Sequence, residues 1–248
     1  LPKLGAGSVY LMRAESPGPI KSKLVPKIGQ SAKILYIIYI VLTAAETVCL
    51  KLAGMSLYDS ICHAMATTAT GGFSTMNQSI AAYNSELINW IVIIFMFLSG
   101  VNFSLFFALI VRDFKTVHKS EELKGYILII LLSIAGITAS RVLTAGDDLF
   151  RSFDEAAFQV VSIITTTGFA TADYSMWPTF CQAIIFLVMF IGGCAGSTAG
   201  GIKVARVPIL LKVLRRETKR IIHPRVVDTI CMGGRLVDEP VLFSATLY

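Results

Sequence analysis

Two short segments rich in threonine and glycine have the composition of a loop that coordinates a cation. They are Thr68-Ala69-Thr70-Gly71-Gly72-Phe73-Ser74 and Ile164-Thr165-Thr166-Thr167-Gly168-Phe169-Ala170. Glycine permits backbone angles that turn consecutive carbonyl oxygens toward one axis, and such oxygens replace the hydration shell of an ion without adding fixed charge. Threonine hydroxyls can supply further oxygens or tie the loop down. Thr/Gly tracts also pack helices together in membranes, so each segment taken alone leaves both interpretations open.

The two segments are copies of one another at a fixed offset, because Gly72 and Gly168 lie 96 residues apart and the positions around them match without a gap. Upstream, Ser56-Leu57-Tyr58-Asp59 matches Ser152-Phe153-Asp154-Glu155. Both have the Ser-x-x-acid form of a capping box, which predicts that a helix starts at each. The same offset brings Gly100 onto Gly196. Two segments in register, each after a capped helix, favour a cation filter over a packing surface.

Membrane helices must hold these segments in place. Four apolar runs, each about the 20 residues that a spanning helix needs, occupy residues 33–54, 87–111, 125–145 and 179–214. A shorter apolar stretch lies between the first two runs and another between the last two, and neither is long enough to cross a bilayer. We therefore expect two re-entrant helices whose C-terminal, partly negative ends point toward the membrane centre and favour a cation there.

The fourth apolar run is interrupted by ten consecutive small residues, Gly192-Gly193-Cys194-Ala195-Gly196-Ser197-Thr198-Ala199-Gly200-Gly201. Such a tract disfavours helix, so we expect the chain to become irregular near the middle of the bilayer. Non-helical backbone at that depth is tolerated only when protein buries it or when it lines a water-filled path. The tract can serve as a gate or as a packing face. A packing face repeats every three or four residues rather than at each one, which favours the gate.

Composition and charge agree with a membrane location. Apolar residues make up 54% of the chain, charged residues 15%, and the mean hydropathy is +0.69, which lies outside the range of ordinary soluble domains. The net charge of +6 does not indicate nucleic acid, because the basic residues cluster between the apolar runs. Of the 22 Lys and Arg residues, only Lys51, Arg141 and Arg151 fall on the side of the two loops, so the other side is predicted to be cytoplasmic.

The side of the loops is instead acidic, which would raise the local concentration of cations at a pore mouth. Its acidic residues are Asp59, Glu86, Asp147, Asp148, Asp154, Glu155 and Asp173. Three of them, Asp59, Asp154 and Glu155, are equally suited to cap the short helices.

An enzyme is not expected. The segment from Gly196 to Lys203 superficially resembles a phosphate-binding loop, but that motif needs Gly-Lys-Ser/Thr and a preceding strand, and Lys203 stands between Ile202 and Val204. The sequence has no evident Ser/His/Asp or Cys/His nucleophile set. A passive membrane scaffold would explain the helices but not the duplicated loops. The cysteines show no paired spacing and are expected to be reduced packing residues, namely Cys49, Cys62, Cys181, Cys194 and Cys231.

Three motifs resemble the TrkH family, the membrane subunits of bacterial Trk potassium uptake systems. They are residues 66–75, 165–171 and 192–203, and the resemblance covers essentially the whole chain. Family members hold four helix, pore loop, helix units in one chain around a single potassium-channel-like pore. The resemblance implies an all-α membrane protein containing the second and third units, with the second helix of the last unit broken by the Gly-rich intramembrane loop. We expect this sequence, which starts at Leu1, to be a piece of a longer chain.

The resemblance also assigns site residues. The potassium-binding filter would be formed by Thr70, Gly71, Gly72 and Phe73 in one unit and by Thr166, Thr167, Gly168 and Phe169 in the other. The gating loop would include Gly192, Gly193, Gly196, Ser197, Thr198, Gly200, Gly201 and Lys203, and family versions usually have Gly in place of Ala199. Potassium would be the substrate, bound as a metal only at the filter, with no covalently bound cofactor. A sodium- or proton-coupled potassium transporter of the KtrB type is the alternative.

These expectations give the chain a definite organisation. It would consist of a cytoplasmic-side linker (1–32), a first unit (33–112), a cytoplasmic loop (113–124), a second unit (125–222) with the gating loop at 192–201, and a second linker (223–248). The basic run from Lys212 to Arg225 is expected to contact anionic lipid, with about 1 kcal/mol from each basic residue near the surface. The resemblance adds a cytosolic nucleotide-binding regulatory subunit of the TrkA type, a homodimer and the bacterial inner membrane, and no nucleic acid is expected.

Overall fold

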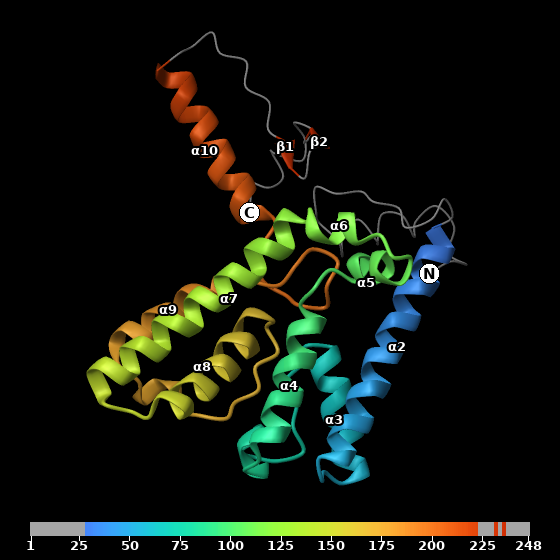
Figure 1. Ribbon diagram of the computed structural model, residues 1–248, viewed down its shortest axis with the longest axis vertical. Coiled ribbons are helices and arrows are strands. Elements are labelled where there is room, and N and C mark those ends of the chain that lie inside the picture. The colour runs from blue at the N-terminus through green and yellow to red at the C-terminus, as the bar shows by residue number, and fades with distance from the viewer. Residues whose placement is uncertain (1–27, 223–230, 233–234, 237–248) are drawn as a thin grey trace.

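The computed structural model describes residues 28–222, 231–232 and 235–236, and this part of the chain is almost entirely helical (Figure 1). The first half contains α2 (Ile28–Leu52), α3 (Leu57–Thr68), the short 3-10 helix η1 (Ser79–Tyr83), α4 (Glu86–Ser99), α5 (Phe103–Ile110) and α6 (Phe114–His118). The second half contains α7 (Glu121–Ser140), the π-helical turn η2 (Arg141–Ala145), α8 (Leu149–Ile164), η3 (Tyr174–Met176), α9 (Thr179–Phe190), α10 (Arg206–Ile222) and two antiparallel strands, β1 (Cys231–Met232) and β2 (Arg235–Leu236). Of the predicted linkers, residues 1–27 and all of 223–248 except these strands lie outside the described residues, as does Arg225.

Among the described residues, two helices are long and apolar enough to cross a membrane. They are Ala32–Leu52, within α2, and Glu121–Ala145, formed by α7 and η2. These helices match the predicted runs at 33–54 and 125–145. The predicted run at 179–214 is divided into α9, the tract of small residues and α10, so the break expected there is present.

The prediction of one continuous helix over 87–111 is wrong. The structure has two helices here, α4 and α5, with a 92° bend between them. A Cβ atom on Gly100 would lie 2.3 Å from the hydroxyl oxygen of Tyr126, so α7 packs directly against the backbone at the bend. Asn102 then starts α5 by accepting the N–H of Ser104 at 2.9 Å. The sequence does contain a signal for this break, because Gly100 is followed by the capping residue Asn102. The apolar residues on both sides made the run resemble one continuous helix.

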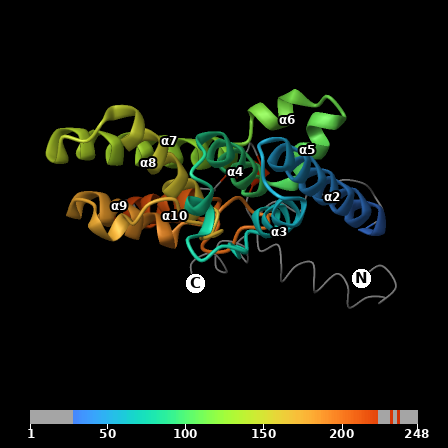
Figure 2. The same ribbon diagram turned by 90° about the horizontal axis from the view of Figure 1, so that it is seen from below.

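The helices form two groups that meet through α4 and α8 (Figure 2). In one group α2 packs against α3 and α4, and in the other α7 packs against α8 and α9. Met96 of α4 and Phe158 and Ile164 of α8 are fully buried where the groups approach. Lipid is as apolar as these side chains, so close packing and hydrogen bonds hold membrane helices together more than hydrophobic burial does.

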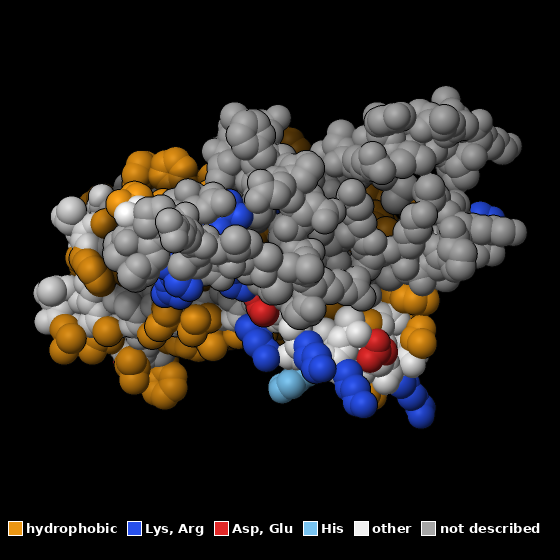
Figure 3. Space-filling view, turned by 90° about the horizontal axis from the view of Figure 1, so that it is seen from above, with side chains coloured by type: hydrophobic (Ala, Val, Ile, Leu, Met, Phe, Trp, Pro, Cys, Tyr) orange, Lys and Arg blue, Asp and Glu red, His pale blue; other side chains and the backbone are white. Residues whose placement is uncertain are grey.

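The outer surface divides into apolar sides and a basic end. Large apolar side chains stay exposed on α2 and α9, as expected for surfaces that face lipid; examples are Tyr36, Ile37, Phe186, Leu187 and Phe190. Seen from the end that carries α6 and α10, Lys and Arg side chains gather on one face (Figure 3). Arg112, Lys115 and Lys119, in and around α6, are exposed. The distribution fits a chain whose two ends meet different membrane surfaces.

Candidate functional site

Each Thr/Gly segment follows the C-terminus of a short helix, α3 or α8. α3 begins as predicted, because Ser56 is its N-cap and the Ser56 hydroxyl accepts the N–H of Asp59 at 3.0 Å. The predicted cap at Ser152 is wrong. α8 begins one turn earlier, where the carboxylate of Asp148 accepts two backbone N–H groups at 3.1 Å. An aspartate at that point already satisfies the free N–H groups of the first turn, and Ser152 is buried inside the helix.

The two segments after these helices have the same unusual backbone. Thr70 and Gly72 have φ angles of +51° and +65°, and their counterparts Thr166 and Gly168 have +56° and +87°. In each segment the residue between the pair does not have a positive φ. The same alternation of φ signs therefore occurs at equivalent positions of both segments, and glycine is the residue that most readily permits it.

The hydrogen bonds that lead into the segments repeat as well. The N–H of Thr70 donates to the carbonyl of Thr67 at 2.9 Å, and the N–H of Thr166 donates to the carbonyl of Ile163 at 2.9 Å. The offset of 96 residues that relates the sequences therefore also relates the backbones. Each segment therefore leaves the C-terminal end of its helix through the same hydrogen-bonded turn.

The two segments lie against each other and belong to one site. A Cβ atom on Gly72 would be 1.9 Å from the carbonyl oxygen of Thr167, so the chains touch at their backbones. Just beyond, the N–H of Ala81 donates to the carbonyl of Ala170, and the N–H of Ala170 donates to the hydroxyl of Ser79, both at 3.3 Å.

Buried side chains support the chain after each segment. His63 of α3 and Gln159 of α8 hold equivalent positions, and both are buried. The Nε2 atom of His63 lies 2.9 Å from the Ser74 hydroxyl, and the Nε2 atom of Gln159 donates to the carbonyl of Ala172 at 3.2 Å. The sequence repeat did not reveal this pair, because the two residue types differ although both support the chain in the same way.

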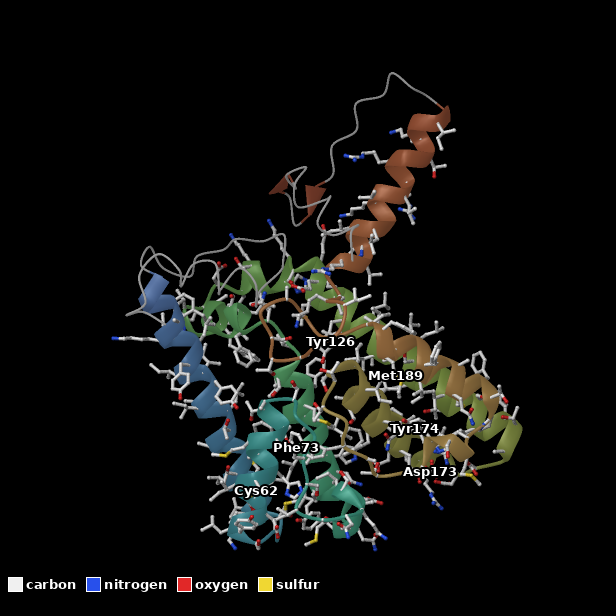
Figure 4. The ribbon with its side chains drawn as sticks, turned by 180° about the vertical axis from the view of Figure 1, so that it is seen from behind. Cys62, Phe73, Tyr126, Asp173, Tyr174 and Met189 are labelled. Carbon is white, nitrogen blue, oxygen red and sulfur yellow. The ribbon has the colours of Figure 1, made fainter. Side chains whose placement is uncertain are left out.

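Phe73 and Phe169 are equivalent in sequence but not in environment. Phe169 is 1% exposed, its ring centroid lies 5.8 Å from that of His63, and its carbonyl accepts the Ser162 hydroxyl at 2.6 Å. Phe73 is 81% exposed, and its label lies over α3 and α4 in the view of Figure 4. The second segment is therefore hydrogen-bonded to α8 at Phe169, whereas the first segment leaves the side chain of Phe73 exposed.

The acidic residues on the loop side have different roles. The carboxylate of Asp59 accepts hydroxyl groups from Thr75 and Ser56, each at 2.7 Å, and these two hydrogen bonds lower the pKa of Asp59. Asp59 thus stays ionised while it fastens the chain beyond the first segment to the start of α3. This agrees with its predicted role at the helix N-terminus.

At the equivalent position in the second copy, Glu155 forms an ion pair instead. The buried guanidinium of Arg141 lies 2.6 Å from Glu155 and 2.7 Å from Asp147, and it stacks 4.7 Å above the ring of Trp177. This cluster fixes α8 to the end of α7. Because Asp147 and Glu155 are paired with a cation, they contribute less negative potential at this surface than the sequence predicts.

The small-residue tract forms a closed, non-helical loop, which is the orange segment between α5 and α7 in Figure 1. The N–H of Gly192 donates to the carbonyl of Ile202 at 2.8 Å, and the N–H of Ile202 donates to the carbonyl of Phe190 at 3.3 Å. Its two ends therefore meet at a paired base. We call residues 192–201 the glycine loop.

The glycine loop pairs with the bend between α4 and α5. The N–H of Cys194 donates to the carbonyl of Gly100 at 2.9 Å, and the N–H of Phe103 donates to the carbonyl of Gly196 at 3.1 Å. Gly100 and Gly196 are equivalent in the repeat. Both copies thus break their second helix at the same point, and the backbone groups freed by each break are satisfied by the other.

The glycine loop also contacts both Thr/Gly segments. The Thr70 hydroxyl donates to the carbonyl of Thr198 at 3.0 Å, and the Thr166 hydroxyl accepts the N–H of Gly200 at 2.7 Å. The predicted filter and predicted gate are therefore directly connected in this structure.

Two buried ionisable side chains, Glu122 and Lys203, also hydrogen-bond to the backbone of the glycine loop. Glu122, near the start of α7, is 5% exposed, and its carboxylate accepts the N–H of Ala195 at 2.5 Å. Lys203, also buried, donates its ammonium to the carbonyl of Ala199.

Sequence reasoning missed two buried glutamates, Glu46 and Glu122. Glu46 lies in α2 and is fully buried, with a carboxylate oxygen 3.5 Å from the Thr68 hydroxyl at the end of α3. An ionisable residue within or at the edge of an apolar run is itself a signal of function. That signal was available for both residues.

Comparisons with known proteins agree with this geometry. The TrkH family, described as cation transport protein, matches residues 1–245. The chain is 41% identical over 247 residues to the Trk system potassium uptake protein TrkH of Salmonella typhimurium, covering 98% of this chain and 51% of the relative. It is 39% identical to the Trk system potassium uptake protein TrkG of Escherichia coli K12, with the same coverage. The crystal structure of the potassium transporter TrkH from Vibrio parahaemolyticus matches with a TM-score of 0.85 and 38% identity, over 97% of this chain and 52% of that one. The chain thus spans about half the length of the curated relatives it matches.

Proposed function

This chain belongs to the TrkH family of cation transport proteins, and on that basis we propose that it forms two neighbouring units of a potassium uptake pore in the bacterial inner membrane. Each unit consists of a membrane helix, a re-entrant helix with its loop, and a second membrane helix, over residues 33–112 and 125–222. The potassium uptake proteins that it resembles are about twice as long, so further units would complete the ring around the pore.

The observation that carries the proposal is the matched alternation of φ signs at Thr70, Gly72, Thr166 and Gly168. The carbonyl groups of residues 70–72 and 166–168 are the proposed potassium ligands, because the carbonyl of Phe169 is already occupied by the Ser162 hydroxyl. A potassium ion loses its water shell to such carbonyls, and the cost of dehydration is offset by several oxygens at once. Packing of helices alone would not require two loops to share this backbone.

The short helices add to the attraction for a cation. α3 ends at Thr68 and α8 at Ile164, within two residues of the first positive φ in each segment. Their last carbonyl groups carry a partial negative charge, which favours a cation within the following turn. The dipoles of both helices therefore act on the proposed ion site without placing a charged side chain in it.

The glycine loop, together with Lys203, is the proposed gate. It is non-helical, it is hydrogen-bonded to the bend between α4 and α5, and it is hydrogen-bonded to both Thr/Gly segments. A flexible segment directly beside an ion filter blocks passage when it is closed and admits ions when it withdraws. Its many contacts favour a closed state.

The charge distribution supports an orientation of the chain in the membrane and a contact with lipid. The end with α6 and α10 carries exposed basic residues and is the proposed cytoplasmic side. α10 carries Lys212, Arg215 and Lys219 at this end, and Lys212 forms an ion pair with Glu121 at 3.0 Å. Anionic lipid headgroups are the proposed contact of this basic surface. A nucleotide-binding regulatory subunit of the TrkA type and a second copy of the protein are further proposed partners.

Ion flux through the full-length protein in proteoliposomes tests the function. We expect potassium and rubidium to move down their gradients, with sodium at least about tenfold slower, because a fixed carbonyl filter suits the larger ions. Flux that proceeds without a sodium or pH gradient supports a pore. Potassium accumulation that requires either gradient would favour the coupled transporter of the KtrB type, and no potassium movement in correctly folded protein would contradict the proposal.

A further inference from the structure

Thr70 and Thr166 stand at equivalent positions of the repeat, and both send their hydroxyl groups to the glycine loop. The Thr70 hydroxyl lies 3.0 Å from the carbonyl of Thr198, and it also lies 2.7 Å from the carbonyl of Ala69. The Thr166 hydroxyl lies 2.7 Å from the nitrogen of Gly200. The two contacts fall on either side of a single residue of the loop, so the loop is held from both units at once.

The backbone of both threonines is arranged for this contact. Left-handed φ angles are unfavourable for a side chain with a branched β-carbon, yet both threonines adopt them. A residue keeps such a conformation only where its surroundings determine it. The Thr70 hydroxyl shares its single proton between the carbonyls of Ala69 and Thr198, and the Thr166 hydroxyl accepts the N–H of Gly200. Each hydroxyl thus contacts a backbone group of the non-helical loop.

We propose that the hydroxyl groups of Thr70 and Thr166 form a two-point clasp that couples the filter to the gate. The glycine loop leaves its closed position only when both hydrogen bonds break, and release of one weakens the hold of the other because 198 and 200 belong to the same short segment. Opening of the glycine loop would therefore remove contacts from Thr70 and Thr166, and so change the surroundings of the filter. This inference rests on the proposed role of the glycine loop as a gate.

Hydrogen–deuterium exchange of the full-length protein tests the clasp without relying on transport. Thr70→Val removes one hydroxyl and keeps the shape of the side chain. We expect the amides of residues 194–201 to exchange about fivefold faster, which is the effect of one such hydrogen bond on an opening equilibrium. The Gly200 amide is the critical probe. It is bonded to Thr166, so its faster exchange in Thr70→Val reports coupling between the two contacts.

Two variants control for nonspecific effects. Thr70→Ser keeps the hydroxyl and should exchange like the wild type. Thr165→Val makes the same substitution beside Thr166, but its hydroxyl is bonded to the Val161 carbonyl at 2.7 Å and to the Thr167 hydroxyl at 2.8 Å, away from the loop. It should leave loop exchange unchanged. Wild-type exchange of the loop in Thr70→Val, or equal acceleration in Thr165→Val, would overturn the clasp.

Rubidium flux measured on the same preparations separates the clasp from the proposed function. A wild-type protein that conducts, together with a Thr70→Val variant whose loop exchanges like the wild type, overturns the clasp alone. A folded wild-type protein that conducts neither potassium nor rubidium contradicts the proposed function and, with it, the gate on which the clasp depends.

Discussion

Replacing Gly72 by alanine is expected to reduce potassium uptake about a hundredfold or more, and the same change at Gly168 about tenfold. Both glycines have positive φ angles, which alanine tolerates poorly. Only at Gly72 would the added methyl group also collide with backbone, 1.9 Å from the Thr167 carbonyl oxygen. At Gly168 no atom of the described chain lies within 4 Å of the added group. Initial uptake rates at equal amounts of protein in the membrane measure the difference.

Gly54 offers a matched control for backbone strain. It lies between α2 and α3, has a φ of +105°, and has open space among the described residues where a Cβ atom would lie. Gly54→Ala introduces a similar left-handed strain far from the carbonyls and should retain near wild-type uptake. Normal uptake and normal preference for potassium in Gly72→Ala would show that these carbonyls are not the ion ligands.

Deleting residues 195–199 from the full-length protein is expected to raise potassium flux about tenfold, because the closed state loses contacts that hold it by a few kcal/mol. The deletion removes the groups that bind Thr70 and Glu122. It leaves the bond between Gly192 and Ile202 that closes the base of the loop, so α9 and α10 need not move far to be rejoined. Rubidium flux in proteoliposomes, with sodium as competitor, provides the measurement.

The filter supplies the control for this deletion. Combining it with Gly72→Ala should abolish the increase, because ions that pass an open gate must still pass the filter. A high flux that survives the combination would indicate a leak elsewhere. An unchanged flux in the correctly folded deletion variant would argue against the gate.

Periodic and repeated features of the fold were predictable from the sequence. The offset between Gly72 and Gly168 predicted two equivalent loops, and the structure repeats their φ signs and the hydrogen bonds that lead into them. The cap at Ser56 and the irregular tract at 192–201 were also predicted, since both depend on local chemistry. Glycine, serine and acidic residues constrain the backbone near themselves, so short sequence patterns suffice.

Features that depend on distant contacts were not predictable. The cap of α8 is a local exception, because Ser152 has the form of a cap and Asp148, one turn earlier, takes that role. Tyr126 of another helix packs directly against Gly100 at the bend, and Glu122 reaches the glycine loop across 73 residues of chain. No local pattern encodes such partners. The acidic character of the loop side was likewise overestimated, because Glu155 pairs not only with Arg151 on its own helix but also with Arg141 at the end of the preceding one.

Anomalous diffraction from rubidium-soaked crystals of the full-length protein tests the central claim most directly, because rubidium replaces potassium in sites formed by carbonyl groups. We expect anomalous peaks between the two Thr/Gly segments, in direct coordination distance of the carbonyl oxygens of residues 70–72 and 166–168. These peaks should weaken in Gly72→Ala crystals. Ordered rubidium found only elsewhere, with these carbonyls facing away from it, would contradict the assignment of the filter.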